Sequence, residues 1–312
     1  MQVNDLIFKE LIKRGYSLEG NTKVWNISDS KLWYLAPEQA QAFLDLEKST
    51  DYQEEVIQKE ISLVEGNISE IIKKLGKAPI NIIDLGCGDG KKAVIFIEHL
   101  KGKVKLRYCP IDISNYMVEK ALDRLKKVNA GEVVEFQWNI SDFENLENIS
   151  NLLRRGDYKK HLFLLLGNTL GNFEINELMY EIRSSMKDGD YLLIGNGLNN
   201  LKIEDILKSY DNPLVDSFLI KILTQIGFQK EDVKLNVRFA NSRVELYYII
   251  LKNKVLTFQD KTLNFSKGDQ ILVSVSYKYD KSDFHGFLKM YFDDVRTYVS
   301  SEGSYVLALC KK

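Results

Sequence analysis

The sequence predicts an α/β protein with a doubly wound, Rossmann-like parallel sheet and a second, smaller α+β domain. Two observations predict this. Between residues 80 and 200, short apolar strand patterns alternate with helix patterns, as they do where parallel strands are joined by helical crossovers. After residue 201 the alternation stops, and strand patterns separated by polar turns follow one another, which indicates antiparallel pairing.

The first part of the chain supplies a helical segment and then the alternation. Residues 32–75 have a helical apolar pattern that only the polar joint KSTDYQ interrupts. The expected strands of the parallel sheet are 80–86, 105–114, 133–141, 161–170 and 190–198, and the expected helices between them are 91–100, 115–128 and 177–187.

The remainder predicts an insertion followed by a return to the first sheet. Helices are expected over 203–210 and 214–227, three antiparallel strand segments over 233–240, 242–253 and 261–279, a helix over 281–292, and a terminal hairpin of 295–300 with 304–310. We therefore expect one domain from residues 61–200 plus 281–312 and a substrate-binding domain from residues 1–60 plus 201–280.

Composition excludes several classes of protein. The 312 residues are 45% apolar, which is enough for a sizeable core, and 43 basic residues nearly cancel 44 acidic ones, so no overall field attracts a nucleic acid. Three widely spaced cysteines and three histidines fall in no ligand spacing, so no metal is expected and the compartment should be reducing. No signal peptide or membrane span is apparent. These features favour a cytoplasmic protein that acts on a small molecule, with a monomer as the favoured state.

A glycine-rich stretch, IIDLGCGDGKK at residues 82–92, follows the first predicted strand. A triphosphate loop needs Ser or Thr after its lysine, but Ala93 follows Lys92 here. A dinucleotide loop needs a third glycine at the position of Lys91, and the acidic Asp84 and Asp89 would repel pyrophosphate. The loop instead suits S-adenosylmethionine (SAM), which carries a sulfonium and no phosphate.

Two later carboxylates fit the same ligand. Asp112 ends the second predicted strand, where a carboxylate can accept both ribose hydroxyls, although the ribose of NAD would be held equally well. Asp142 and Phe143 follow the third predicted strand and could contact adenine, although Asp142 could also cap a helix. Together with the loop, they predict a class I SAM-dependent methyltransferase sheet.

A second motif, LGNTLGNF at residues 166–173, resembles the signature of the histidine-specific SAM-dependent methyltransferases. The resemblance extends over most of the chain, through WYLAPEQAQAFLDLEKSTDYQ upstream and LKSYDN, NSRVELYY and LNFSKGDQILVSVSYKY downstream. It implies that the acceptor is an amino acid methylated on its α-amino group.

The resemblance also implies roles for individual residues. Tyr52 and Asn172 would orient the reacting amine, and both would bind the acceptor together with Tyr210, Ser274 and Ser276. The residues that would contact SAM are Tyr34, Gly86, Cys87, Gly88, Lys92, Asp112, Asp142 and Phe143. Lys92 can neutralise the carboxylate of the methionine part of SAM, or can be an ordinary solvated lysine.

One position departs from the family pattern. Where the family has Thr-Glu-(Ile or Val)-Ser, this chain has Val273-Ser274-Val275-Ser276. A serine in place of glutamate loses a charged hydrogen bond to the acceptor, worth about 1.5 to 3 kcal/mol. We therefore predict a SAM-dependent N-methyltransferase for histidine-like or other aromatic amino acids. The alternatives are a methyltransferase for RNA or protein, and a SAM-binding module without activity.

Overall fold

The structure is a computed structural model that describes residues 3–49, 56–200 and 202–312. It divides into two compact units, each made of segments from distant parts of the chain. We call Glu47–Asn200 with Tyr279–Lys312 the parallel-sheet unit, and Met1–Leu46 with Leu201–Lys278 the insertion unit. No helix in the described part of the chain is long and apolar enough to cross a membrane.

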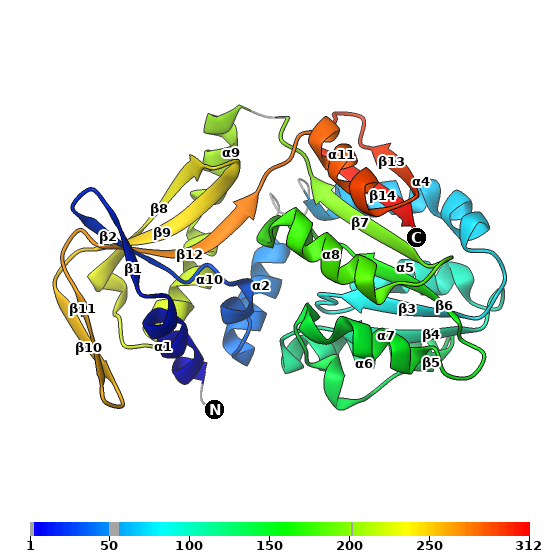
Figure 1. Ribbon diagram of the computed structural model, residues 1–312, viewed down its shortest axis with the longest axis horizontal. Helices are drawn as coiled ribbons and strands as arrows, with labels where there is room; N and C mark the ends of the chain where they lie inside the picture. Colours follow the sequence, from blue (N-terminus) through cyan, green and yellow to red (C-terminus); the bar gives the residue numbers. More distant parts are fainter. Residues whose placement is uncertain (1–2, 50–55, 201) are drawn as a thin grey trace. The chain divides into compact units, whose positions relative to one another are not determined.

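The parallel-sheet unit contains a seven-stranded sheet with the order β13-β14-β7-β6-β3-β4-β5 (Figure 1). Strands β7, β6, β3, β4 and β5 are parallel, while β14 runs antiparallel to β7 and β13 antiparallel to β14. The predicted doubly wound sheet and its C-terminal hairpin are thus confirmed. The strands are β3 (Ile80–Leu85), β4 (Leu106–Ile111), β5 (Glu132–Val133), β6 (Lys160–Leu165), β7 (Tyr191–Gly197), β13 (Asp294–Val299) and β14 (Tyr305–Lys311).

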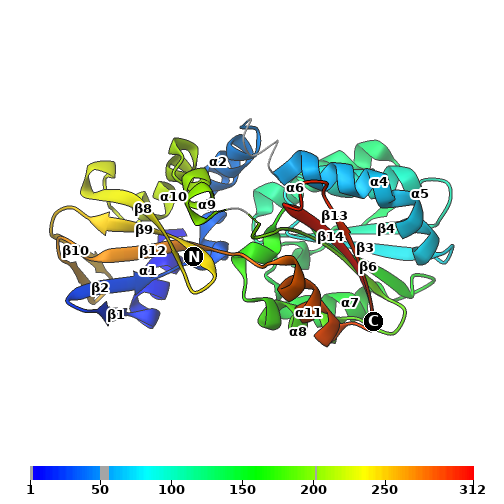
Figure 2. The same cartoon turned by 90° about the horizontal axis from the view of Figure 1, so that it is seen from above.

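Helices cover both faces of this sheet (Figure 2). Helices α4, α5 and α6 lie on one face, and α7, α8 and α11 lie on the other. Every residue of β3 is buried, as expected for a strand that is covered on both sides. The helices are α4 (Gln58–Leu75), α5 (Lys91–Leu100), α6 (Asn115–Val128), α7 (Leu146–Leu153), α8 (Ile175–Ser185) and α11 (Lys281–Tyr291).

The third predicted strand, over residues 133–141, is wrong for most of its length. Strand β5 ends at Val133, and a 3₁₀ helix, η3 (Gln137–Asn139), follows. The Asn139 side chain accepts from the Phe136 N–H at 2.6 Å and donates to the Pro110 carbonyl at 2.7 Å. An asparagine that bonds the backbone in this way competes with the strand ladder. The segment returns to β4 only as an isolated parallel bridge between Asp112 and Ile140.

The insertion unit contains a five-stranded sheet with the order β1-β2-β12-β9-β8 and a separate hairpin of β10 with β11. The predicted antiparallel strands over 233–240 and 242–253 are confirmed as β8 and β9. The third predicted segment, 261–279, is divided into β11, which pairs with β10, and β12, which pairs antiparallel with β9. Strands β1 and β2 near the N-terminus were not predicted. Strand β2 joins β12 in parallel. The strands are β1 (Tyr16–Glu19), β2 (Thr22–Asn26), β8 (Val233–Ala240), β9 (Arg243–Ile250), β10 (Lys254–Phe258), β11 (Lys261–Phe265) and β12 (Gln270–Tyr277).

Helix α10 packs against this sheet, where the Tyr248 hydroxyl of β9 donates to Asp216 Oδ1 at 2.7 Å. The sequence explains why α10 starts at Pro213, since the Asn212 side chain caps the helix and proline is favoured in a first turn. Strand β12 has a bulge at Val273, and the Val273 carbonyl accepts instead from the Trp33 indole N–H at 2.8 Å. The helices of this unit are α1 (Val3–Arg14), the 3₁₀ helix η1 (Ser30–Trp33), α2 (Pro37–Glu47), which ends at the boundary between the units, α9 (Ile203–Tyr210), α10 (Pro213–Thr224) and the 3₁₀ helix η6 (Lys230–Asp232).

Candidate active site

The parallel strands of the larger unit end at one edge of the sheet, where ligands bind in open α/β folds. The predicted glycine loop follows β3 at this edge. Gly86, Gly88 and Gly90 have φ angles of +66°, +52° and +73°, a region that residues with a side chain rarely adopt. The Gly86 and Cys87 N–H groups both donate to the Ile111 carbonyl, at 2.8 and 3.1 Å. The loop is therefore fixed to the end of β4.

Cys87 takes part in this loop through its backbone. Its side chain is buried against Val118 and Ala121 of α6. Burial raises the pKa of the thiol well above its usual range, so the thiolate that a nucleophile needs is disfavoured.

The Asp112 carboxylate closes the loop from the end of β4. Its Oδ2 accepts from the Gly88 N–H at 3.1 Å and its Oδ1 from the Ser114 N–H at 3.0 Å. Burial raises the pKa of Asp112 to about 6 against these backbone hydrogen bonds. The Ile113 N–H is a third backbone group that lowers this pKa. A carboxylate can accept about four hydrogen bonds, so Asp112 keeps acceptor capacity for a ribose.

A second buried carboxylate, Asp84, lies in β3 below the loop. It accepts from the Tyr108 hydroxyl at 2.8 Å, and burial raises its pKa to about 7. The Asp84 carboxylate is thus bound by a side chain of the neighbouring strand β4.

The segment after η3 brings Asp142 and Phe143 beside Asp112. The Ser141 N–H donates to the Asp112 carbonyl at 2.9 Å, next to the Asp112–Ile140 bridge. The Phe143 ring lies 5.5 Å from the ring of Phe173, between centroids. This contact joins the segment after the third parallel strand to the LGNTLGNF motif after β6.

That motif forms a tight 3₁₀ turn, η5 (Thr169–Asn172). The side chain of Asn168, which has a φ of +64°, accepts from the Gly197 N–H at 2.8 Å and fixes the turn to the end of β7. Asn172 is half-buried at the end of the turn, and within residues 3–49, 56–200 and 202–312 its side-chain amide has no hydrogen-bond partner. Both its donor and its acceptor are available to a ligand.

Lys92, at the start of α5, has a protein partner that the sequence did not reveal. Its Nζ lies 3.2 Å from Glu60 Oε2, and Glu60 is 1% exposed. Glu60 also accepts from the Gly167 N–H at 2.9 Å and the Tyr305 hydroxyl at 2.8 Å. Burial opposes the charge of Lys92, but Glu60 and Glu47 outweigh it and raise the pKa of the ammonium.

Two glycines make room for this pair. A Cβ at Gly167 would overlap the Lys92 ammonium, and a Cβ at Gly195 in β7 would overlap the Glu60 carboxylate. No local signal in the sequence separates Glu60 from the other acidic residues of α4, because its backbone contact is 107 positions away.

The insertion unit holds the other predicted site residues. Tyr34 packs in an aromatic cluster, with its ring 5.2 Å from Phe43 and 5.7 Å from Phe218. Ser274 and Ser276 are each 6% exposed and follow the Val273 bulge. The Tyr210 hydroxyl donates to Ser276 Oγ at 2.8 Å, so the structure brings these two predicted residues together. Tyr52 lies outside the described residues.

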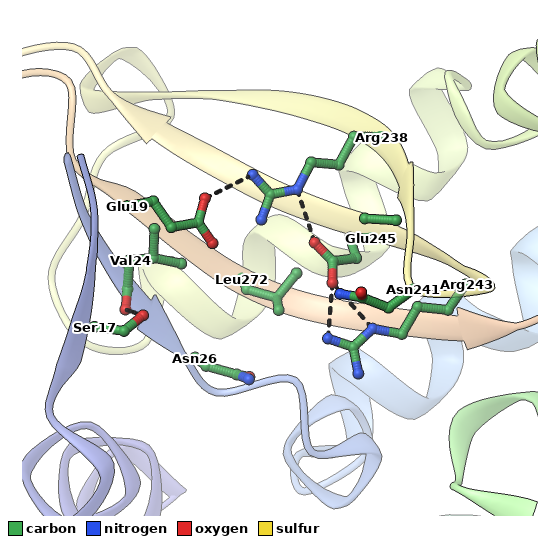
Figure 3. Close-up of a pocket in the computed structure, with 10 residues that line it drawn as sticks. Ser17, Glu19, Val24, Asn26, Arg238, Asn241, Arg243, Glu245 and Leu272 are labelled. Atoms are coloured by element: carbon green, nitrogen blue, oxygen red, sulfur yellow. Dashed lines mark hydrogen bonds and ion pairs between the residues drawn. The ribbon is translucent and has the colours of Figure 1, made fainter. Parts of the chain in front are cut away.

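The insertion unit also has a pocket of about 370 Å³ on the sheet (Figure 3). Arg238 and Arg243 point into it and share Glu245, whose side chain is 3% exposed. Glu19 pairs with Arg238 at 3.3 Å. Two positive and two negative groups therefore neutralise one another inside this pocket.

The sequence has a match among known families. A family model described as histidine-specific methyltransferase, SAM-dependent, matches residues 40–312. The chain belongs to this family. It is therefore a SAM-dependent methyltransferase, and SAM is its cofactor, as the loop predicted. No curated protein matches the sequence.

Solved structures similar to this methyltransferase include other methyltransferases. A SAM-dependent methyltransferase from Clostridium acetobutylicum is 13% identical, with a TM-score of 0.46 over 87% of this chain and 98% of that one. The CurJ carbon methyltransferase is 11% identical, with a TM-score of 0.49 over 91% and 61%. Human N-acetylserotonin methyltransferase, solved with SAM, is 12% identical, with a TM-score of 0.43 over 99% and 65%.

The glycine loop of this histidine-specific methyltransferase family member has groups that suit SAM. Asp112 keeps acceptor capacity for the ribose. Among the described residues, apart from its chain neighbours, nothing lies within 4 Å of where a Cβ at Gly88 would be, so a ligand can approach the backbone there.

Proposed function

We propose that this methyltransferase transfers the methyl group of SAM to the α-amino group of a small amino acid, histidine or another with an aromatic side chain. The observation that carries the proposal is Asn172. Its side-chain amide has no partner within the described residues and follows β6 at the edge that also holds the glycine loop and Asp112. An amide of this kind can accept a hydrogen bond from an amine and so orient its lone pair.

The SAM site in this proposal uses the backbone of Gly86, Cys87 and Gly88, the Asp112 carboxylate for the ribose, and Asp142 with Phe143 for adenine. Tyr34 would contact SAM from the insertion unit. Lys92 would face the carboxylate of the methionine part while it keeps its pair with Glu60. The carboxylate of SAM would then be a second anion beside one ammonium.

The chemistry is an in-line displacement. The amine lone pair attacks the methyl carbon, the carbon–sulfur bond breaks, and S-adenosylhomocysteine leaves with the electron pair. Positive charge passes from sulfur to nitrogen, so alignment of the two reactants supplies most of the catalysis. Asn172 and Tyr52 would orient the amine, and water would take the proton that the amine loses. The acceptor would be held by these two residues with Tyr210, Ser274 and Ser276.

Two other functions are tested by the same experiment. The insertion unit could instead dock an RNA or a protein, although the overall charge of −1 does not favour RNA. The chain could also bind SAM without transferring its methyl group.

The three free, buried cysteines are consistent with a reducing compartment, and we propose the cytoplasm.

The test combines calorimetry with SAM and mass spectrometry of reactions that contain pooled amino acids. We expect SAM to bind and one amino acid to gain mass in steps of a methyl group. Asn172→Ala should lower kcat about tenfold or more while SAM binding is kept, since it removes orientation and not the cofactor site. Labelling of a macromolecular fraction with no labelled amino acid would overturn the proposal.

A further inference from the structure

Three polar side chains meet at the end of β12. The Lys278 ammonium donates to the Tyr210 hydroxyl at 2.7 Å and to Ser276 Oγ at 3.2 Å, and the Tyr210 hydroxyl donates to Ser276 Oγ at 2.8 Å. Lys278 Nζ also lies 5.2 Å from the centre of the Tyr210 ring. We call Tyr210, Ser276 and Lys278 the lysine triangle. All three residues belong to the insertion unit.

The triangle has hydrogen-bond donors left over. An ammonium has three N–H groups and the two hydroxyls have one O–H each, so the triangle has five donors. Its three internal bonds use two N–H groups and one O–H. One N–H and one hydroxyl O–H therefore remain, whichever hydroxyl donates inside the triangle. A partner for these two groups has to be a hydrogen-bond acceptor.

The triangle also carries a positive charge. Within residues 3–49, 56–200 and 202–312, no carboxylate lies within 4.0 Å of the Lys278 ammonium. Other cations of the same unit are neutralised, since Arg238 and Arg243 share Glu245, and Lys252 and Lys254 share Asp232. A group with two acceptor oxygens and a negative charge matches what the triangle offers.

Lys278 is the last residue of the insertion unit before the chain enters the parallel-sheet unit. Lys278 is bonded to Tyr279, whose carbonyl accepts from the Asn199 N–H at 2.8 Å, just beyond the end of β7. The carboxyl ends of β3, β6 and β7 share that edge.

We propose that the lysine triangle binds a carboxylate of the methyl acceptor, with Lys278 as its cation. The inference rests on the proposed function, which assigns Tyr210 and Ser276 to the acceptor site. The carboxylate has two possible sources, the α-carboxylate of any amino acid and the side chain of an acidic one. The sequence pattern is consistent with this grouping, because Ser274, Ser276 and Lys278 are spaced two residues apart, as residues on one face of a strand are.

The test measures binding by calorimetry to the full chain saturated with S-adenosylhomocysteine, so that no methyl transfer is needed. The probes are L-histidine, L-phenylalanine and L-glutamate, each compared with its α-amide, and L-glutamine. If the α-carboxylate is bound, an acid should bind about 10- to 100-fold more tightly than its α-amide. If the triangle binds the side-chain carboxylate of an acidic amino acid, glutamate should bind more tightly than glutamine by a similar factor. The α-amide of glutamate should then bind as tightly as glutamate itself.

Variants then assign the preference to Lys278. Lys278→Met should remove the preference for the acid and leave amide binding unchanged, and Lys278→Arg should restore most of it because the charge is kept. Lys234→Met, which removes an exposed lysine of β8 in the same unit, should behave as the wild-type protein. The comparison of acids with amides in the wild-type protein needs no variant, so a folding defect cannot hide the result.

The outcomes separate this inference from the proposed function. Equal binding of acids and amides by the wild-type protein, unchanged binding by Lys278→Met, or no binding of any acid would overturn the inference. Acids that bind through Lys278 but gain no methyl group would overturn the proposed function alone. Methylation of an amino acid, when neither an acid over its α-amide nor glutamate over glutamine is bound more tightly, would overturn the inference alone.

Discussion

Lys92 and Glu60 form an ion pair of 3.2 Å at the carboxyl edge of the parallel sheet, and the Glu60 carboxylate is almost fully buried. The pair joins α4 to the first residues of α5, and through the Gly167 N–H it also holds the start of the LGNTLGNF turn. A lysine expected to meet the cofactor is therefore part of the framework as well.

Glu60→Gln should lower the free energy of unfolding by about 3 kcal/mol, because it leaves the mostly buried Lys92 ammonium without its closest partner. Denaturant unfolding measures the change. The double variant Glu60→Gln/Lys92→Met should recover part of the loss, since no buried charge then stays unpaired. In the single variant Lys92→Met, an affinity for SAM equal to that of the wild-type protein would contradict a contact of Lys92 with the cofactor.

The affinity for S-adenosylhomocysteine should depend on the ionisation of Asp112. Its pKa of about 6 is raised by burial, and only the carboxylate can accept from both ribose hydroxyls. Affinity should therefore be constant above pH 7 and fall by up to about tenfold per pH unit below pH 6. Calorimetry between pH 5 and 7.5 measures this dependence.

Asp112→Asn provides the control for that titration. It should bind about 10- to 100-fold more weakly at pH 7.5, and the dependence on pH should become shallower because the titrating group is gone. A variant that follows the wild-type pH curve would assign the effect to another group, of which Asp84 is the nearest candidate, with its pKa of about 7.

Ser274→Glu should tighten the binding of histidine by about 10- to 100-fold, because it restores a charged acceptor for the imidazole N–H. Calorimetry with histidine and S-adenosylhomocysteine measures the change, and Ser274→Gln is the control of equal length without charge. Unchanged or weaker binding in the glutamate variant, with unfolding as in the wild-type protein, would remove Ser274 from the acceptor site.

Glu245→Gln should lower the free energy of unfolding by about 2 kcal/mol. Its carboxylate accepts from Arg238 Nε and Arg243 Nη2, both at 2.7 Å, and its loss leaves two partly buried guanidinium groups without their shared anion (Figure 3). The matched control is Glu19→Gln. Glu19 pairs with the same Arg238 but has a side chain that is 54% exposed, so the change should stay within about 0.5 kcal/mol. If both variants lowered the free energy of unfolding equally, burial of Glu245 would not explain the strength of its ion pairs.

Much of the larger unit could be predicted because its signals are local. An apolar run such as INIIDL at β3, followed by glycines and an amphipathic helix, defines a strand, a loop and a crossover from neighbouring residues alone. The same holds for the glycine loop and Asp112, whose spacing along the chain already places both at the carboxyl ends of adjacent strands.

The features that escaped prediction depend on distant residues. The segment 133–141 has the apolar pattern of a strand, but the side chain of Asn139 takes the Pro110 carbonyl and turns the chain. Glu60 gains its role from Gly167, and Ser276 meets Lys278 and Tyr210 through contacts that span up to 68 positions. Strand β2 was missed because it is short and joins a partner near the other end of the chain.

The parallel pairing of β2 with β12 has a consequence for synthesis on the ribosome. Val24 and Trp25 pair with Gln270 and Ile271, so the sheet of the insertion unit cannot close until residue 271 has been made. At about 5 to 20 residues per second, roughly 12 to 50 seconds separate the two strands. For most of that time the Phe8 ring of α1 lacks Phe258, on which it stacks in the folded protein. Strand β2 is thus made long before the strand beside which it lies in the folded protein.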